Sequence, residues 1–197
     1  MENNKSIEKL IENSLKELSR IGDENAIQQD AESRLLFPKY RNGDKRVSEQ
    51  ELRFLLAREL ENQKKYYYSV ETPTEDKYSF EGDSSLSARI DLSLHDSNGK
   101  RLNLIEFKYK NVDVKNDFLK LLCDLETDLN YFVQFVDNNN KDTIPSIENK
   151  YQEALASIHK NRKEIKSNVK IILFVISTRI FYKYEINKDG LLNKVEG

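Results

Sequence analysis

An alternating stretch from Ala88 to Lys110 constrains the fold of this chain more than any other feature. Polar and apolar residues alternate on each side of its central Asn98-Gly99 pair. A period of two is typical of a β-strand with one buried face. Asn-Gly favours a two-residue type I′ turn, because both turn positions need a positive φ. The stretch therefore predicts an antiparallel hairpin.

That turn also fixes the register of the hairpin. If Asn98 and Gly99 form the loop, residues that face each other across the hairpin have numbers that sum to 197. Apolar residues then face apolar residues, and the predicted pairs are Leu92 with Ile105 and Ile90 with Phe107.

The other side of the hairpin is charged. Asp91 is predicted to lie opposite Glu106, and Arg89 opposite Lys108. Facing side chains have Cβ atoms roughly 4.5–5.5 Å apart, and like charges at that distance are destabilising. Mg²⁺ binds oxygen ligands and keeps waters that a substrate phosphate can replace. Two facing carboxylates with a lysine on the same side therefore form a candidate site for a divalent cation.

Asp91, fourteen further residues and then Glu106-Phe107-Lys108 resemble the signature of the PD-(D/E)XK nuclease superfamily. The resemblance covers roughly residues 45–180, and Ile90 stands where the family name has proline. It implies a restriction-endonuclease-like fold and a metal-dependent nuclease activity. It also implies that Asp91, Glu106 and the backbone carbonyl of Phe107 bind Mg²⁺ or Mn²⁺.

A helix is predicted from residue 48 to residue 61. Ser48 and Glu51 fit a capping box at its start. In the resembled family a glutamate on this helix reaches the metal, which makes Glu51 a candidate catalytic and metal-binding residue. The capping box and the helix dipole explain an acid at this position equally well. Glu49 is the weaker candidate of the two.

The remaining periodic segments predict the rest of the fold. Helices are expected over residues 4–20, 113–129 and 147–166, and strands over 66–71, 130–137, 169–177 and 181–186. Thr72-Pro73 is expected to end the first strand, with a long loop over 74–87. This order predicts an α/β fold: a mixed central sheet with helices on both faces, a restriction-endonuclease-like α/β/α sandwich. The chain is expected to be one domain, 1–197, with an N-terminal arm of helix and loops over 1–45 and a nuclease core over 46–187.

The function expected from these residues is hydrolysis of phosphodiester bonds in DNA, with RNA the less favoured substrate. A bound metal lowers the pKa of a water and stabilises charge on the phosphate. Lys108 is expected to orient or deprotonate that water, or to neutralise developing charge. The residues expected to contact nucleic acid are Arg89, Lys110, Lys115 and Lys120, although a solvated helix face also explains the lysines. The resemblance suggests bacterial genome defence or DNA processing as the setting.

Composition limits the alternatives. One cysteine excludes an internal disulfide framework and suits the cytoplasm, and two histidines are too few for a histidine metal site. The sequence has no Gly-rich phosphate loop, no CxxC pair and no HExxH motif. Its longest apolar run is too short for a membrane span, so no membrane partner is expected, while a homodimer is left open. The net charge of −2 gives no general basic excess for binding nucleic acid.

Two other functions stay open. The first is a catalytically silent nuclease-fold protein that acts as a module for binding nucleic acid or protein. The second is a structural domain in which Asp91, Glu106, Arg89 and Lys108 form a surface charge network. Surface ion pairs contribute little to stability, so the second explains these residues only weakly.

Overall fold

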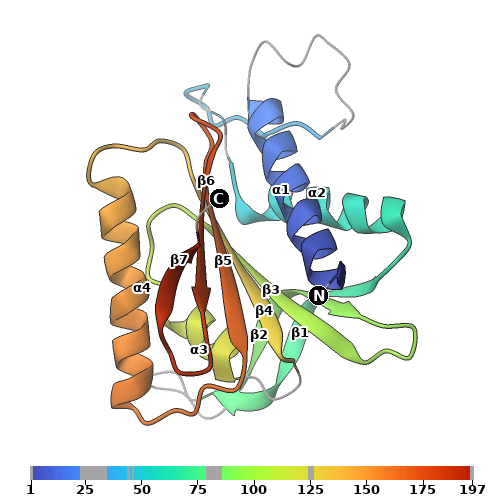
Figure 1. The fold of residues 1–197 in the computed structure, drawn as a ribbon. Helices are drawn as coiled ribbons and strands as arrows, with labels where there is room; N and C mark the ends of the chain where they lie inside the picture. Colours follow the sequence, from blue (N-terminus) through green and yellow to red (C-terminus); the bar gives the residue numbers. More distant parts are fainter. Residues whose placement is uncertain are drawn as a thin grey trace.

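The computed structural model describes residues 2–22, 35–43, 45, 47–78, 86–123 and 127–195. These form an α/β fold in which a seven-stranded mixed sheet is accompanied by four helices (Figure 1). The helices are α1 (Glu2–Gly22), α2 (Glu49–Gln63), α3 (Lys115–Cys123) and α4 (Thr143–Lys160). The strands are β1 (Tyr67–Tyr78), β2 (Leu86–His95), β3 (Arg101–Tyr109), β4 (Leu129–Val136), β5 (Asn168–Val175), β6 (Ile180–Ile186) and β7 (Leu192–Val195).

The strands lie in the sheet in the same order as in the chain. Neighbours are antiparallel at both ends, whereas β3, β4 and β5 run parallel to one another. Parallel neighbours need a crossover connection, and α3 and α4 provide the two that this sheet requires. The sheet extends past the predicted core boundary at residue 187, because β7 forms its last strand.

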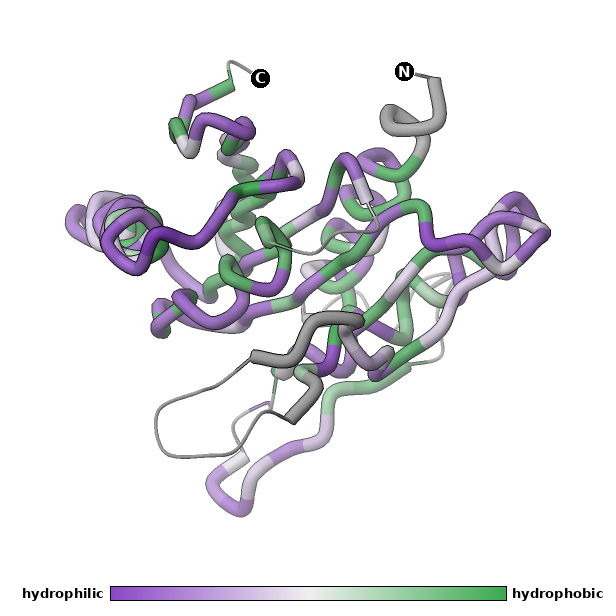
Figure 2. Tube along the Cα trace, turned by 90° about the horizontal axis from the view of Figure 1, so that it is seen from below, coloured by the Kyte–Doolittle hydropathy of each residue, from purple (hydrophilic) through white to green (hydrophobic). Residues whose placement is uncertain are grey.

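The buried apolar residues form two clusters, one on each face of the sheet. One contains the apolar stripes of α1 and α2, and the other contains those of α3 and α4. The central strands contribute alternately to both, so Phe132 belongs to one cluster and Val133 to the other. Hydrophobic segments accordingly gather along the strands inside the molecule, and hydrophilic ones on its outside (Figure 2). A strand covered on both faces explains the continuous apolar runs of β4 and β5.

The hairpin formed by β2 and β3 has the predicted register but a different turn. Leu92 pairs with Ile105 and Leu94 with Asn103, as predicted. The two-residue turn is wrong: the register shifts by one after Leu94, and Gly99 has a positive φ of 80° whereas Asn98 does not. The cause is Asp96, whose Oδ1 accepts hydrogen bonds from two backbone amides of the turn, both at 2.9 Å. Such a side chain stabilises a longer turn than Asn-Gly alone predicts.

The prediction that Ile90 packs beside Phe107 is also wrong. Ile90 is buried with the α3 and α4 cluster, whereas Phe107 is buried with the α1 and α2 cluster. The two therefore lie on opposite faces of the sheet. The backbone pairing of β2 with β3 runs from the turn only as far as Leu92 and Ile105. Beyond that point, among the described residues, β2 pairs only with β1, and β3 pairs only with β4.

The first strand is longer than predicted, because Thr72-Pro73 does not end it. β1 continues to Tyr78, and Pro73 pairs with Arg89 of β2, before a register shift. β1 is an edge strand, where the missing N–H of proline is tolerated. Of the predicted loop over 74–87, residues 74–78 and 86–87 are strand, and 79–85 lie outside the described residues.

The N-terminal helix packs onto the rest of the molecule. Buried residues of α1 join the cluster that also contains α2 and one face of the sheet. Lys170 of β5 pairs with Glu8, and Lys183 of β6 donates to Glu12 at 2.6 Å. Among the described residues, none of the helices combines the length and hydrophobicity that crossing a membrane requires.

Candidate site at the open end of the hairpin

The candidate site lies where the backbone ladder between β2 and β3 ends. There the amide of Phe107 donates to Asp91 Oδ2 at 2.9 Å, and the amide of Tyr109 donates to Glu49 Oε1 at 2.9 Å. Two carboxylates thus accept the hydrogen bonds that a neighbouring strand would otherwise accept. Since the N–H and C=O of a strand residue point to the same edge, the Phe107 carbonyl faces Asp91 as well.

The structure brings Asp91 and Glu106 together, as the register predicts. The Glu106 side chain is only 3% exposed, and burial raises its pKa well above the usual range. The nearby charge of Asp91 raises it further, and the two carboxyl groups also interact by a hydrogen bond. A buried carboxyl beside another carboxylate favours its protonated form. The pair therefore holds a proton more strongly than two isolated acids would.

Lys120 is part of this site and does not lie on a solvated helix face, which was the alternative to its predicted contact with nucleic acid. Its Nζ pairs with Glu106, donates to the Arg89 carbonyl at 3.0 Å and lies 3.2 Å from Asp117 Oδ1. The residue is 8% exposed. Burial alone would lower the pKa of Lys120, but the two carboxylates outweigh it and the pKa is raised. Lys120 acts as an internal counter-ion.

Lys108 lies next to this pair. Its Nζ is 3.2 Å from Asp117 Oδ2, so Asp117 bridges Lys108 and Lys120. Burial works to lower the pKa of Lys108, but Asp117 and Glu49 raise it by more. A general base must lose its proton near neutral pH. Of the roles predicted for Lys108, neutralising charge or orienting a water fits this environment, and deprotonating a water does not.

Arg53 pairs with Asp91 from the other side. This side chain, on α2, reaches Asp91 through one guanidinium nitrogen and Glu71 of β1 through the other, at 2.6 Å. Arg53 and Asp117 were not predicted as site residues. Both come from helices whose position against the hairpin no local pattern reveals. The only signal in the sequence is spacing: Arg53 is one turn after Glu49, and Asp117 one turn before Lys120.

The glutamate of α2 that reaches the site is Glu49, not Glu51. Glu51 accepts a hydrogen bond from the Ser48 amide at 2.9 Å and contacts the Ser48 hydroxyl, which completes the capping box. Its carboxylate is therefore committed to the first turn of its own helix. Burial raises the pKa of Glu49, and the charges of Lys108 and Asp91 act on it too. The weaker of the two candidates is thus the one beside Asp91.

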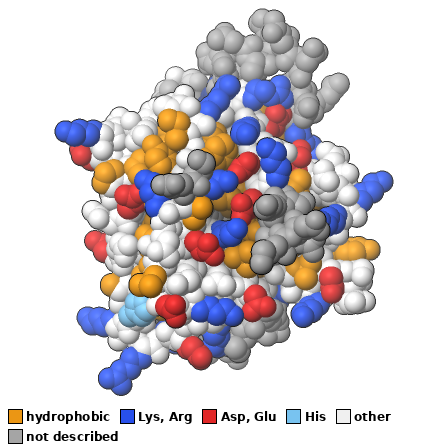
Figure 3. All heavy atoms as spheres, viewed as in Figure 1, with side chains coloured by type: hydrophobic (Ala, Val, Ile, Leu, Met, Phe, Trp, Pro, Cys, Tyr) orange, Lys and Arg blue, Asp and Glu red, His pale blue; other side chains and the backbone are white. Residues whose placement is uncertain are grey.

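The other predicted nucleic-acid contacts remain on the surface. Arg89, Lys110 and Lys115 are exposed, and the Lys110 ammonium lies over the Tyr109 ring, 5.2 Å from its centroid. Among the described residues on the face drawn in Figure 3, Lys and Arg side chains are interspersed with Asp and Glu.

An open pocket of about 350 Å³ leads to the acidic cluster. It is lined by Ser48, Glu49, Gln50, Arg53, Glu71 and Tyr109. Glu49 and Arg53 thus face the pocket and also contact the β2–β3 end described above. A ligand in this pocket meets those two side chains first, with Asp91 directly behind Arg53.

The oxygen-rich donor set fits a hard divalent cation. Five carboxylates gather here against the three cations Arg53, Lys108 and Lys120, an excess of two negative charges. The acids are Glu49, Glu71, Asp91, Glu106 and Asp117. Burial, and after it the charge of Asp91, raises the pKa of Glu106 within this cluster. Within the described ranges, however, no three His, Cys, Asp or Glu side chains converge closely enough to hold a metal.

Comparison with known proteins identifies no family for this chain. No protein-family model matches the chain, and no curated protein is similar to it at the significance required.

Proposed function

We propose that this protein is a metal-dependent phosphodiesterase that cleaves nucleic acid, DNA in preference to RNA. The observation that carries the proposal is the contact between Asp91 and Glu106 at the open end of the hairpin, with Lys108 beside them. The resemblance to the PD-(D/E)XK signature points the same way. We extend the proposal to the finer fold, a restriction-endonuclease-like arrangement of this seven-stranded sheet and its helices.

The metal in this proposal is Mg²⁺ or Mn²⁺. Asp91, Glu106 and the Phe107 carbonyl would hold it, since all three present oxygen at the edge where the strands separate. Glu49 takes the place proposed for Glu51 as the acid from α2, because it already lies at this edge. When bound, the metal supplies positive charge for the scissile phosphate and lowers the pKa of a water.

The neighbouring cations have distinct parts in this proposal. Lys108 stays protonated and binds an oxygen of the phosphate, where a fixed positive charge stabilises the charge that develops during cleavage. Asp117 pairs with Lys108 and fixes the position of its ammonium group. Arg53 keeps the Asp91 carboxylate oriented while its other nitrogen pairs with Glu71 at the pocket wall. Lys120 balances the buried charge of Glu106.

A second function is favoured by one specific observation. Asp91 and Glu106 each already pair with a cation of the protein, Arg53 and Lys120 respectively. Two carboxylates that already have cationic partners within the protein need no metal for their stability. That arrangement suits a catalytically silent protein of the same fold that binds nucleic acid or protein without cleaving it.

Cleavage assays separate the two functions. Single-stranded and double-stranded DNA and RNA are incubated with the protein in Mg²⁺, in Mn²⁺ and in EDTA. We expect metal-dependent cleavage of DNA that falls by about 100-fold or more in Asp91→Asn, Glu106→Gln and Lys108→Ala, the range typical of lost electrostatic stabilisation. Lys160→Ala, an exposed lysine on α4, is the matched control and should cleave like the wild type.

Two results would count against the nuclease. Cleavage by Lys108→Ala at the wild-type rate would mean that a contaminant is being measured or that the assignment is wrong. Binding of DNA by the wild type, with no cleavage of any substrate in either metal, would establish the silent module instead.

A further inference from the structure

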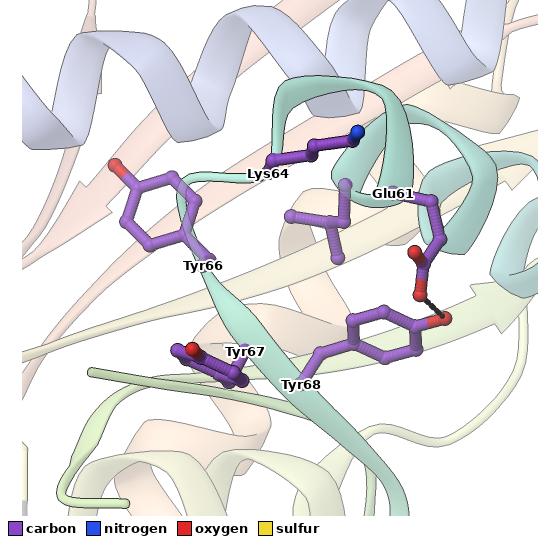
Figure 4. A pocket seen from close by; sticks show the side chains of 6 residues that line it. Glu61, Lys64, Tyr66, Tyr67 and Tyr68 are labelled. Atoms are coloured by element: carbon purple, nitrogen blue, oxygen red, sulfur yellow. Dashed lines mark hydrogen bonds between the residues drawn. The ribbon is translucent and has the colours of Figure 1, made fainter. Parts of the chain in front are cut away.

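A second pocket lies at the other end of α2, away from the acidic cluster. It has a volume of about 570 Å³ and lies between the C-terminal turn of the helix and the start of β1. Its lining residues are Leu60, Glu61, Lys64, Tyr66, Tyr67 and Tyr68. Figure 4 shows Tyr66 and Tyr67 on one side of the chain and Tyr68 on the other, where its ring points toward Glu61 of the helix.

The three tyrosines differ in what their rings offer a ligand. Tyr66 is 8% exposed, and the ammonium of Lys65 lies over its ring at 5.3 Å. Tyr68 is partly buried, and its hydroxyl donates to Glu61 at 2.9 Å (Figure 4). Tyr67 is 65% exposed on the edge strand. The ring of Tyr67 is thus open to solvent at this pocket, whereas the rings of Tyr66 and Tyr68 already have partners within the protein.

The charged residues of the pocket define the chemistry of its ligand. Lys64 is the C-cap of α2 and holds a left-handed backbone conformation, with φ of 52°. Lys64 and Glu61 are both exposed at this pocket, and Glu61 supplies hydrogen-bond acceptors, one of which Tyr68 already uses. A nucleotide combines a flat aromatic face, amino and imino donors and a phosphate. Tyr67, Glu61 and Lys64 match these three groups in turn.

A cationic peptide side chain is the competing ligand, because tyrosines and a carboxylate also bind ammonium and guanidinium groups. Two observations disfavour it. Lys64 is itself part of the lining, and the face of Tyr66 is already covered by Lys65. Two lysines at one pocket repel a further cation and attract a phosphate.

The position of the pocket relates it to the acidic site. Both pockets are lined by residues of α2 or of its caps together with residues of β1. From Glu49 to Glu61 the helix rises about 18 Å. Phe54 and Val70 lie on these two elements between the pockets, and both are exposed. The two pockets are therefore ends of one edge of the molecule with aromatic and apolar side chains along it.

We propose that the tyrosine pocket binds a base of a single-stranded nucleic acid whose backbone continues along α2 to the acidic site. This inference rests on the proposed function. It narrows the substrate class of the acidic site to single-stranded nucleic acid. Base stacking on an aromatic ring is tolerant of sequence, so the pocket would set strandedness and polarity of the substrate, not its sequence.

The test is binding without metal, so that it does not depend on cleavage. Fluorescence anisotropy of a labelled single-stranded 12-mer of mixed sequence is measured in EDTA with the full chain. Tyr67→Ala should raise Kd by about 5-fold or more, as expected for the loss of one stacked base. Tyr67→Phe keeps the ring and should bind within about 2-fold of the wild type. Leu191→Ala, equally exposed but in the β6–β7 turn, is the control.

A salt titration tests the phosphate contact. Loss of one contact with single-stranded nucleic acid lowers the slope of log K against log salt by about 0.7. Lys64→Gln should show that reduction, whereas Lys160→Ala, an exposed lysine on α4, should keep the wild-type slope. The chain has no tryptophan, so quenching of tyrosine emission by an unlabelled oligonucleotide, reduced in Tyr67→Phe, confirms the position of the base independently.

Several outcomes would overturn the inference. These are no binding of the 12-mer by wild type, equal affinity of Tyr67→Ala and wild type, or a preference for an arginine-rich peptide over the oligonucleotide. Binding that depends on Tyr67 in EDTA, without cleavage when Mg²⁺ is added, would keep the inference and remove the nuclease. Metal-dependent cleavage with no effect of Tyr67→Ala on binding would do the reverse.

Discussion

The two ends of the β2–β3 hairpin follow different rules. At the turn end, Leu92 and Leu94 pair with their predicted partners and their side chains are fully buried. At the other end the backbone ladder stops, and the Phe107 amide donates to a side chain instead. The turn end is a structure that local sequence rules describe. The open end exists only because α2 and α3 bring cations and a further acid against it.

This difference shows how the fold accommodates the carboxylates at the open end of the hairpin. Carboxylates that face each other in a regular ladder destabilise it. Here Asp91 and Glu106 each acquire an internal counter-ion, and Asp91 also takes over a backbone hydrogen bond. Arg53 and Lys120 therefore offset the expected repulsion, while burial and the charge of Asp91 together raise the pKa of Glu106.

The largest effect is expected from Lys120→Ala. This change leaves Glu106 buried without its main counter-ion, and breaking such a pair costs about 3–5 kcal/mol. For a chain of this size the melting temperature should fall by at least about 6 °C. Lys115→Ala on the same helix is exposed and should change stability by less than about 0.5 kcal/mol. Similar melting temperatures for the two variants would show that Lys120 is not an internal counter-ion.

A smaller loss is expected at Asp91. Asp91→Ala leaves the Phe107 amide and one guanidinium nitrogen of Arg53 without their acceptor, at a cost of about 1–3 kcal/mol. Asp96→Ala at the turn end removes two hydrogen bonds to exposed amides, which water can replace, so it should cost less. Urea denaturation of both variants measures the difference. The reverse order would contradict the view that the open end depends on its carboxylates.

Binding of Mg²⁺ should stabilise the folded protein by an amount that depends on pH. With Mg²⁺ at about ten times its dissociation constant, the wild type should gain about 1.4 kcal/mol. Because the pKa of Glu106 is raised in the folded state, its contribution to stability falls as pH rises from about 4.5 through that raised pKa. Mg²⁺ competes with the same proton, so its stabilising effect should grow over this range. Thermal melts from pH 5 to pH 8 test this, and Glu106→Gln should abolish the pH-dependent increase. An equal shift in wild type and Asp91→Ala would exclude the site.

The smallest effect is expected at Gly99. Its φ is +80°, and an added Cβ would meet no atom within 4 Å, so only the backbone conformation is strained. Gly99→Ala should cost about 1 kcal/mol. Cleavage and oligonucleotide binding should stay at wild-type levels, because the turn end carries no site residue. A loss of activity larger than the loss of stability would mean that the two ends are coupled.

What the sequence predicts here depends on how far apart the interacting residues are. The pairs from Leu92 to Leu94 follow from alternation alone, and the closeness of Asp91 to Glu106 follows from the same register. Arg53 is 38 residues from Asp91, and its contact depends on how α2 packs on the sheet. An acid in the first turn of this helix fits both a capping box and a metal ligand, so the sequence does not show that Glu51 forms the box while Glu49 reaches the site. Only the three-dimensional packing distinguishes them.

The errors at β1 and at the turn have local causes. Proline is a sound sign that a strand ends, except at the edge of a sheet, and no linear pattern places β1 at the edge. The Asn98-Gly99 pair alone predicts the shorter turn, whereas the Asp96 carboxylate accepts hydrogen bonds from the amides of Asn98 and Lys100 and stabilises the longer one. A side chain that accepts hydrogen bonds from two backbone amides outweighs the turn preference of the Asn98-Gly99 pair.

The order of the strands has a consequence for how the chain is made. Because spatial order follows chain order, each strand can join the growing sheet as it leaves the ribosome. The first helix is the exception, since its Glu8 and Glu12 pair with lysines 162 and 171 residues later. At 5–20 residues per second, roughly 10–30 s pass before those partners exist. Throughout that interval the apolar stripe of α1 lacks part of its final cover, so the first segment synthesised is among the last to reach its complete native contacts.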